Sequence, residues 1–182
     1  AFVMPALSTD PSVREQAFER FRSVDNRRRE PWVLESLQYL NHPLREPAAI
    51  QRRHFGESLA LLKALEKHEA LGSPVIDIGS GAGFPGLAMK IARPALQVTL
   101  LEATGKKAAF LEMVVRELGM NGVTVVNGRA EEAAHDATHR GTYMLAVARA
   151  VAPLRVLAEL SLAFVRRGGY LAAPKGSAAP RE

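Results

Sequence analysis

The feature that most constrains the fold of this chain is an alternation of short apolar runs with amphipathic stretches, which begins at residue 75. Runs of this length predict buried strands, and spacings of three and four predict helices. The expected strands are 75–78, 98–101, 123–126, 144–147 and 170–173, and the expected helices are 87–92, 106–118 and 153–165. Strands that alternate with helices predict a parallel sheet covered on both faces. We therefore expect a doubly wound α/β fold.

The residues before this alternation predict a separate helical segment. Residues 1–46 contain two short helical patterns, and the prolines from Pro43 to Pro47 indicate a linker. An amphipathic helix is expected from Ala48 to about His68. We accordingly divide the chain into an N-terminal helical segment, residues 1–46, and an α/β domain, residues 47–182.

The distribution of charge is more informative than the net charge of +5. Residues 1–46 hold seven basic and seven acidic side chains, and residues 47–182 hold the remaining 17 and 12. A basic excess favours a polyanionic partner, although a solvated basic surface has the same composition. Cysteine is absent, no apolar run approaches the ~18 residues of a membrane span, and Ala1 to Met4 do not resemble an export signal. We expect a cytoplasmic protein with no membrane partner.

The loop after the first expected strand predicts a ligand site, because ligands of doubly wound sheets bind outside the carboxyl ends of the strands. It runs from Asp77 to Gly86 and has glycines at positions 79, 81 and 83. Gly79, Gly81 and Gly83 allow a sharp turn and a close approach of a ligand to the backbone. The spacing Gly81-x-Gly83-x-x-Gly86 also fits a dinucleotide-binding loop, which leaves a domain of the NAD-binding type as an alternative.

Carboxylates at the ends of two strands favour a cationic nucleoside over a dinucleotide. Asp77 lies two residues before Gly79, where a pyrophosphate would be repelled and a sulfonium cofactor with an ammonium group would be attracted. Glu102 ends the second strand, 19 residues after Gly83, and can accept the hydroxyl groups of a ribose. A small and a polar residue, Ala130 and Glu131, follow the third strand and can flank an adenine. A helix cap or an ion pair would also account for Asp77, and an exposed strand-end carboxylate for Glu102.

The fourth strand is followed by Arg149, which suits a nucleic-acid substrate through a phosphate or a guanine edge. A structural ion pair with Glu102 or Asp77 is the other interpretation of this arginine. Other basic candidates for phosphate contacts with RNA are Arg52, Arg53 and His54 at the head of the amphipathic helix, and Lys106. A solvated polar face would also account for these residues. His135 and His139 stand four residues apart, but no third ligand follows at a suitable spacing, so no metal is expected.

Taken in order, the motifs of residues 47–182 resemble the family of bacterial 16S ribosomal RNA methyltransferase G, also called glucose-inhibited division protein B. The matching phrases are Arg53-His54-Phe55-Gly56-Glu57-Ser58-Leu59, Asp77 to Gly86 with Phe84-Pro85-Gly86, Glu102 to Lys107, Arg129-Ala130-Glu131, Ala148-Arg149-Ala150 and Lys175-Gly176. This resemblance implies a Rossmann-like class I methyltransferase core. It also implies transfer of a methyl group from S-adenosylmethionine to N7 of a guanosine in 16S rRNA of the small ribosomal subunit.

The resemblance assigns roles to individual residues. Gly79 and Phe84 would line the methionine side of the cofactor, Glu102, Ala103 and Thr104 would hold the ribose, and Ala130 and Glu131 would flank the adenine. Arg149 would lie beside both cofactor and acceptor as the catalytic residue, and Lys175 joins the candidate RNA contacts. No general base is expected, since guanine N7 already carries a free lone pair and loses no proton.

Two departures from the family pattern accompany the resemblance. The family continues beyond the fifth strand, so the sheet of this chain is expected to be truncated there, with an open edge. Residues 1–46 loosely resemble a C-terminal helical region of zinc aminopeptidases, without the His-Glu-x-x-His motif of a zinc peptidase. A fused or truncated domain that is catalytically silent, but still binds cofactor or RNA, is therefore the alternative function.

Overall fold

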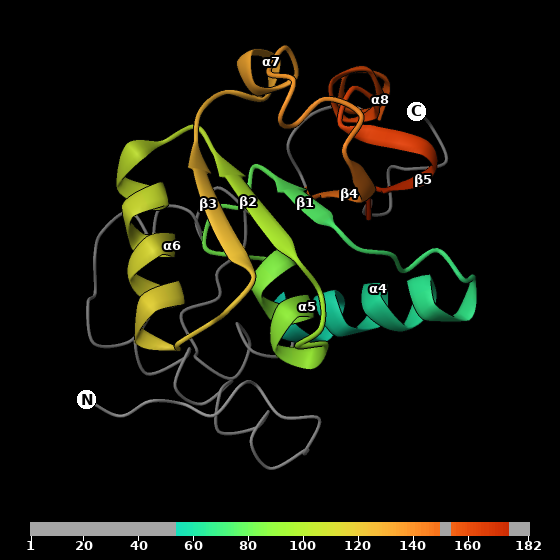
Figure 1. Cartoon of the computed structure of the whole chain (residues 1–182). Coiled ribbons are helices and arrows are strands. Elements are labelled where there is room, and N and C mark those ends of the chain that lie inside the picture. The colour runs from blue at the N-terminus through green and yellow to red at the C-terminus, as the bar shows by residue number, and fades with distance from the viewer. Residues whose placement is uncertain (1–53, 150–153, 175–182) are drawn as a thin grey trace.

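The computed structural model describes residues 54–149 and 154–174 (Figure 1). The elements are α4 (Gly56–Lys67), β1 (Val75–Ile78), α5 (Gly86–Ala92), β2 (Val98–Glu102), α6 (Gly105–Glu117), β3 (Val123–Asn127), α7 (Ala130–Ala133), β4 (Tyr143–Ala148), α8 (Leu154–Leu162) and β5 (Val165–Ala172). The predicted α/β alternation is confirmed. The expected helical segment 1–46, and the domain boundary after it, lie outside the described residues.

The described strands form one parallel sheet in the order β3-β2-β1-β4-β5. The chain moves outward from β1 to β3 and then returns to the other side of β1 with β4. In the register of the sheet, Ile78 is level with Leu101 of β2 and with Ala148 of β4. The carboxyl ends of three strands therefore meet beside the point where the strand order reverses, which is where such sheets bind ligands.

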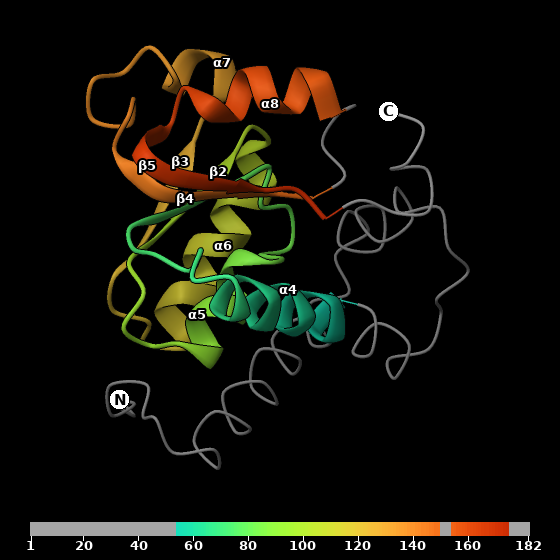
Figure 2. The same ribbon diagram turned by 90° about the vertical axis from the view of Figure 1, so that its right-hand side faces the viewer.

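Helices cover both faces of the sheet, and the molecule has three layers (Figure 2). One face packs against α4, α5 and α6, and the other packs against α7 and α8. Each face of the sheet has its own hydrophobic core, and alternate residues of β1 point into one or the other. Val75 belongs to the core on the first face, and Ile76 and Ile78 belong to the core on the second. All four residues of β1 are buried, which explains its continuous apolar character around a single aspartate.

The last helix and strand differ from the sequence prediction. A helix was expected to reach Val165 and a strand to begin at Tyr170, whereas α8 ends at Leu162 and β5 already begins at Val165. Gly168 and Gly169, which lie between the expected helix and the expected strand, belong to an irregular part of β5 where the pairing with β4 shifts register. Gly168 has φ of +78°, and a Cβ on Gly169 would lie 2.7 Å from the carbonyl oxygen of Met144. These glycines thus fit a β-bulge.

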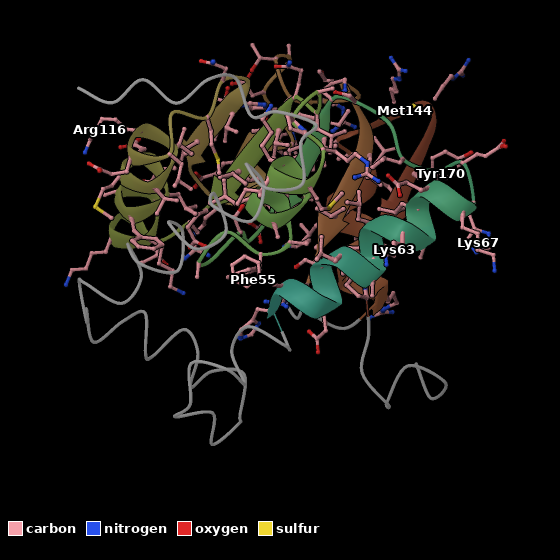
Figure 3. The ribbon with its side chains drawn as sticks, turned by 90° about the horizontal axis from the view of Figure 1, so that it is seen from below. Phe55, Lys63, Lys67, Arg116, Met144 and Tyr170 are labelled. Carbon is pink, nitrogen blue, oxygen red and sulfur yellow. The ribbon has the colours of Figure 1, made fainter. Side chains whose placement is uncertain are left out.

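Other differences are small. The short helix α7 was not expected, and α4 ends one residue before the expected His68, while residues 48–53 of the expected helix lie outside the described part. Figure 3 shows α4 from below, with Lys63 and Lys67 on its solvent side and Phe55 at its other end. No helix in residues 54–149 and 154–174 combines the length and apolarity needed to cross a bilayer.

Candidate functional site

The glycine loop joins β1 to α5 at the carboxyl edge of the sheet. Its three glycines, Gly79, Gly81 and Gly83, have φ values of +70°, +57° and +96°, a region that side chains with a Cβ rarely adopt. The amides of Gly79 and Ser80 donate to the carbonyl oxygen of Leu101 at 2.8 and 3.1 Å. The loop is therefore folded toward β2 by its own backbone.

The glycines differ in what surrounds them. A Cβ on Gly83 would lie 2.5 Å from Leu87 Cδ1, and a Cβ on Gly86 would lie 2.7 Å from Asp77 Oδ2. A Cβ on Gly81 would meet only the carbonyl oxygen of Gly79, at 3.9 Å. Gly83 and Gly86 are thus required for packing between the loop and its surroundings, whereas open space remains beside Gly81.

Glu102 binds the glycine loop directly. Its Oε2 accepts a hydrogen bond from the amide of Gly81 at 2.9 Å, and its Oε1 accepts one from the amide of Thr104 at 2.8 Å. The carboxylate is 6% exposed, so these hydrogen bonds are shielded from competing water. The alternative interpretation of Glu102, an exposed strand-end carboxylate, is therefore wrong.

Asn127, which the sequence analysis missed, supports the same corner. Its side-chain amide donates to the carbonyl oxygen of Glu102 at 2.8 Å and to that of Ala103 at 3.3 Å. Because Asn127 ends β3 level with Glu102, it fixes the backbone that leaves β2. The sequence signal was an amide side chain at a strand end beside the candidate site.

Asp77 lies beneath the loop instead of facing the solvent. Its Oδ2 accepts a hydrogen bond from the amide of Gly86, the first residue of α5, at 2.9 Å. The carboxylate is fully buried, and its Oδ1 has no hydrogen-bond partner among the described residues. Burial raises the pKa of Asp77 to about 7, against the opposing effects of the Gly86 amide and the charge of Arg149. In this geometry Asp77 holds the start of α5, which is the helix-cap role considered above.

Arg149 is held by two residues from the start of α4. Its Nη1 donates to Oε2 of Glu57 at 3.2 Å, and its Nη2 donates to Nδ1 of His54 at 2.9 Å. The alternative interpretation of Arg149, an ion pair with Glu102 or Asp77, is wrong in its partner, because the ion pair is with Glu57. The positive charge of Arg149 acts on Asp77 only by lowering its pKa. Glu57, which makes this ion pair, appeared in the sequence analysis only as part of a motif.

Phe84 is the centre of a ring cluster at the end of the glycine loop. The Phe55 ring meets it edge-on with centroids 4.8 Å apart, and the His54 ring lies 5.4 Å away. The guanidinium carbon of Arg149 is 5.8 Å from the Phe84 centroid, within the range of a cation–π contact. With Phe84 only 8% exposed, the cluster brings together α4, the glycine loop and the end of β4.

The remaining predicted residues are distributed around this corner. Ala103 and Thr104 are exposed between β2 and α6, and Ala130 and Glu131 begin α7 after β3. Lys106 is exposed in the first turn of α6. His54, expected to contact phosphate, is instead 2% exposed and packed inside, so its ring does not face the surface. Arg52, Arg53 and Lys175 lie outside the described residues.

The two histidines considered as metal ligands have other surroundings. His139 Nδ1 lies 2.7 Å from the hydroxyl of Tyr143, and the two rings are stacked. His135 is exposed. Among the described residues, no group of three side chains from His, Cys, Asp and Glu could hold a metal ion. His139 instead contacts Tyr143, the first residue of β4.

Solved structures share the fold. An S-adenosylmethionine-dependent methyltransferase from Aquifex aeolicus matches with a TM-score of 0.53 and 20% identity, over 76% of this chain and 70% of the other. A mutant of MtNAS in complex with S-adenosylmethionine matches with a TM-score of 0.55 and 17% identity, over 89% and 60% of the two chains. The fold is thus the Rossmann-like fold of this class of methyltransferases.

Sequence relatives are much closer. Proteins named ribosomal RNA small subunit methyltransferase G are 52% identical over 129 residues in Roseiflexus castenholzii, 48% over 133 residues in Chloroflexus aggregans and 44% over 131 residues in Alkaliphilus metalliredigens. These matches cover 71–73% of this chain and 54–55% of the relatives, so the chain spans about half their length. The model of the family described as rRNA small subunit methyltransferase G matches residues 40–182. The chain belongs to the rRNA small subunit methyltransferase G family.

Proposed function

We propose that this protein binds S-adenosylmethionine at the glycine loop and methylates N7 of a guanosine in 16S rRNA of the small ribosomal subunit. The observation that carries the proposal is the contact of Glu102 with the Gly81 amide, in a chain that belongs to this family. It places a strand-end carboxylate and an open glycine loop side by side. A cytoplasmic location, where ribosomal subunits are assembled, is part of the same proposal.

The charges around the loop fit this cofactor. Its sulfonium and ammonium groups are cationic, and the loop is flanked by Glu102 and underlain by Asp77, whose Oδ1 lacks a partner among the described residues. A dinucleotide would instead bring a pyrophosphate to amides of the loop. Here the Gly81 amide already donates to a carboxylate, which would repel that group. The geometry therefore supports the sulfonium nucleoside over the NAD-type alternative.

The proposed roles of individual residues follow the arrangement around the loop. Gly79, Gly81 and Gly83 provide the turn, and Phe84 closes its end. Glu102, Ala103 and Thr104 occupy the connection to α6, where a ribose diol can be bound, and Ala130 and Glu131 begin α7, where an adenine can be flanked. Asp77 acts from below by holding Gly86. The bound cofactor supplies an electrophilic methyl group.

The protein's own contribution to methyl transfer is positional. Guanine N7 has an in-plane lone pair, so no side chain has to remove a proton. Arg149, at the carboxyl end of β4, is the residue proposed to orient the guanine or a neighbouring phosphate. Holding the reactants in line accounts for a large part of the rate of such a transfer.

The RNA surface is proposed from exposed basic residues. Lys106 is exposed in the first turn of α6, which follows β2 at the carboxyl edge of the sheet. Arg52, Arg53 and Lys175 belong to the same proposal, although they lie outside the described residues. The basic excess of residues 47–182 agrees with an RNA partner.

Cofactor binding is tested by titration calorimetry with S-adenosylmethionine. A dissociation constant far weaker than ~1 mM, which corresponds to roughly 4 kcal/mol, would count against the proposal. The variant is Gly81→Val, and the control is Gly141→Val. Gly141 also has a positive φ, +61°, and open space around it, but it precedes β4 at the opposite edge of the sheet. Both substitutions place a valine at a positive φ. Loss of cofactor binding in Gly81→Val, with binding retained in Gly141→Val, would support a cofactor site at the glycine loop.

Methyl transfer is tested on small ribosomal subunits and on protein-free 16S rRNA that lack the modification. The expected product is 7-methylguanosine, identified by mass spectrometry of a nuclease digest. Binding of the cofactor without any methyl transfer would instead support the catalytically silent domain.

A further inference from the structure

We propose that His54, just before α4, and Glu57, in its first turn, are positioning residues that set the direction of the Arg149 guanidinium. The inference rests on the proposed function of the site and adds two residues to it. It also assigns a task to α4, a helix outside the strand–helix alternation that forms the sheet.

Three contacts of the described residues orient the guanidinium group of Arg149. Nη2 faces His54 Nδ1 at 2.9 Å, Nη1 faces Glu57 Oε2 at 3.2 Å, and the face of the group lies over Phe84 at 5.8 Å. The two hydrogen bonds fix the direction in which the guanidinium points, and the Phe84 ring supports one face of the group. A planar guanidinium can make both hydrogen bonds and the ring contact at the same time, whereas the compact ammonium group of a lysine cannot.

The histidine contact is the stronger of the two. Glu57 is half exposed, and ion pairs at such positions contribute little because water screens them. His54 is 2% exposed. A guanidinium has donors only, so Nδ1 of His54 must be an unprotonated acceptor, with the ring proton on Nε2. A buried acceptor that faces a buried part of a cation gives a directional contact.

The same turn of α4 also contacts the glycine loop. The rings of His54 and Phe55 pack on Phe84, and the Ser58 hydroxyl donates to the carbonyl oxygen of His54 at 2.6 Å. The beginning of α4 thus joins the loop after β1 to the residue after β4. Arg149 is more than 90 residues away from His54 along the chain, so only the fold brings them together.

This arrangement predicts which kinetic constant depends on His54. If the histidine only fixes the direction of Arg149, its loss disturbs the alignment of acceptor and cofactor more than the affinity for either. The effect should therefore appear in kcat, with a much smaller change in the dissociation constant of S-adenosylmethionine.

The experiment compares three variants of the full chain. His54→Leu fills the same space without an acceptor, and His54→Asn restores an acceptor oxygen near the position of Nδ1. His68→Leu, an exposed position after the other end of α4, is the matched control. We expect kcat to fall by about 10- to 100-fold in His54→Leu, to recover to within about fivefold in His54→Asn, and to remain unchanged in His68→Leu.

A cycle with Arg149→Met shows whether the histidine acts through the arginine. The double variant His54→Leu with Arg149→Met should be no slower than Arg149→Met alone. Additive losses, or equal kcat values for His54→Leu and His54→Asn, would overturn the inference, since they would mean that His54 contributes packing only.

A spectroscopic readout keeps the inference separate from the proposed function. In protein labelled with ¹⁵N-arginine, the side-chain signals of Arg149, assigned through Arg149→Lys, report on its hydrogen bonds. We expect these signals to shift or broaden in His54→Leu and to return in His54→Asn, whether or not the protein methylates rRNA. Unchanged Arg149 signals in His54→Leu would overturn the inference even if methyl transfer is observed.

Discussion

The amide of Gly81 donates a hydrogen bond to Oε2 of Glu102 at 2.9 Å, so the loop after β1 is attached to the end of β2. The other oxygen of the same carboxylate accepts from the Thr104 amide. One side chain thereby holds two loops of the proposed cofactor site. The fixed carboxylate is also the group proposed to receive the ribose, so binding would require little rearrangement.

Replacement of Glu102 by alanine should weaken cofactor binding strongly. A hydrogen bond to a charged group contributes roughly 1.5–3 kcal/mol, and each 1.4 kcal/mol corresponds to about tenfold in affinity. We expect the dissociation constant of S-adenosylmethionine to rise by at least about tenfold in Glu102→Ala, measured by calorimetry. Glu112→Ala, on the exposed side of α6, should leave it unchanged. If the two variants bound S-adenosylmethionine with equal affinity, Glu102 would not be a residue of the cofactor site.

The glycine at position 86 should tolerate no side chain. A Cβ there would lie 2.7 Å from Asp77 Oδ2 and from Leu100 Cδ2, and overpacking of this kind costs about 1–3 kcal/mol. Gly86→Ala should therefore lower the free energy of unfolding by that amount in urea denaturation. Gly56→Ala, with nothing within 4 Å of its Cβ at the start of α4, should be neutral or slightly stabilising. A neutral Gly86→Ala would contradict the close packing of Asp77 beneath α5.

The sheet could be predicted from the sequence because its signals are local. Four strands show in the sequence as short apolar runs and the loop after the first shows as closely spaced glycines, and the structure confirms β1 to β4 within a residue or so at each end. The start of β5 could not be found, because the strand is irregular around Gly168 and Gly169 and its register there depends on the neighbouring strand β4.

The contacts within the site were much harder to predict. Asp77 and Glu102 were identified from their places at strand ends, but the sequence does not show which way a carboxylate turns. In the structure the Asp77 carboxylate points inward and binds the Gly86 amide, and the Glu102 carboxylate binds the Gly81 amide. The contact of His54 with Arg149 depends on how α4 packs against the sheet, and no periodicity along the chain reports that packing.

The pKa of Asp77 predicts a pH dependence of stability. Burial raises this pKa from the ordinary value near 4 to about 7 in the folded protein. Between these values the folded state holds a proton that the unfolded state has released, so the contribution of Asp77 to stability falls as pH rises from about 4 to about 7 and levels off above. Asp77→Asn, which keeps an acceptor for the Gly86 amide, should lack this fall.

The measurement is urea denaturation of both proteins at a series of pH values. Other carboxylates titrate in the same range, so the informative quantity is the difference between Asp77→Asn and the parent protein. That difference should grow in favour of the variant, by a few kcal/mol at most, as pH rises toward 7. A difference independent of pH would mean that Asp77 is ionised throughout the range and that its burial is compensated by a neighbouring charge.

Removal of the Lys106 charge should change how RNA binding depends on salt. Each phosphate contact releases condensed counterions, so the loss of one contact lowers the slope of log affinity against log salt by roughly one. We expect this decrease in Lys106→Ala, measured by fluorescence anisotropy with a 16S rRNA fragment over a range of KCl concentrations. Lys67→Ala is the control, since Lys67 is exposed in the last turn of α4, at the end away from Phe55 (Figure 3). A decrease of the same size in both variants would show a diffuse electrostatic attraction, and would exclude a phosphate contact specific to the edge of the sheet that carries the glycine loop.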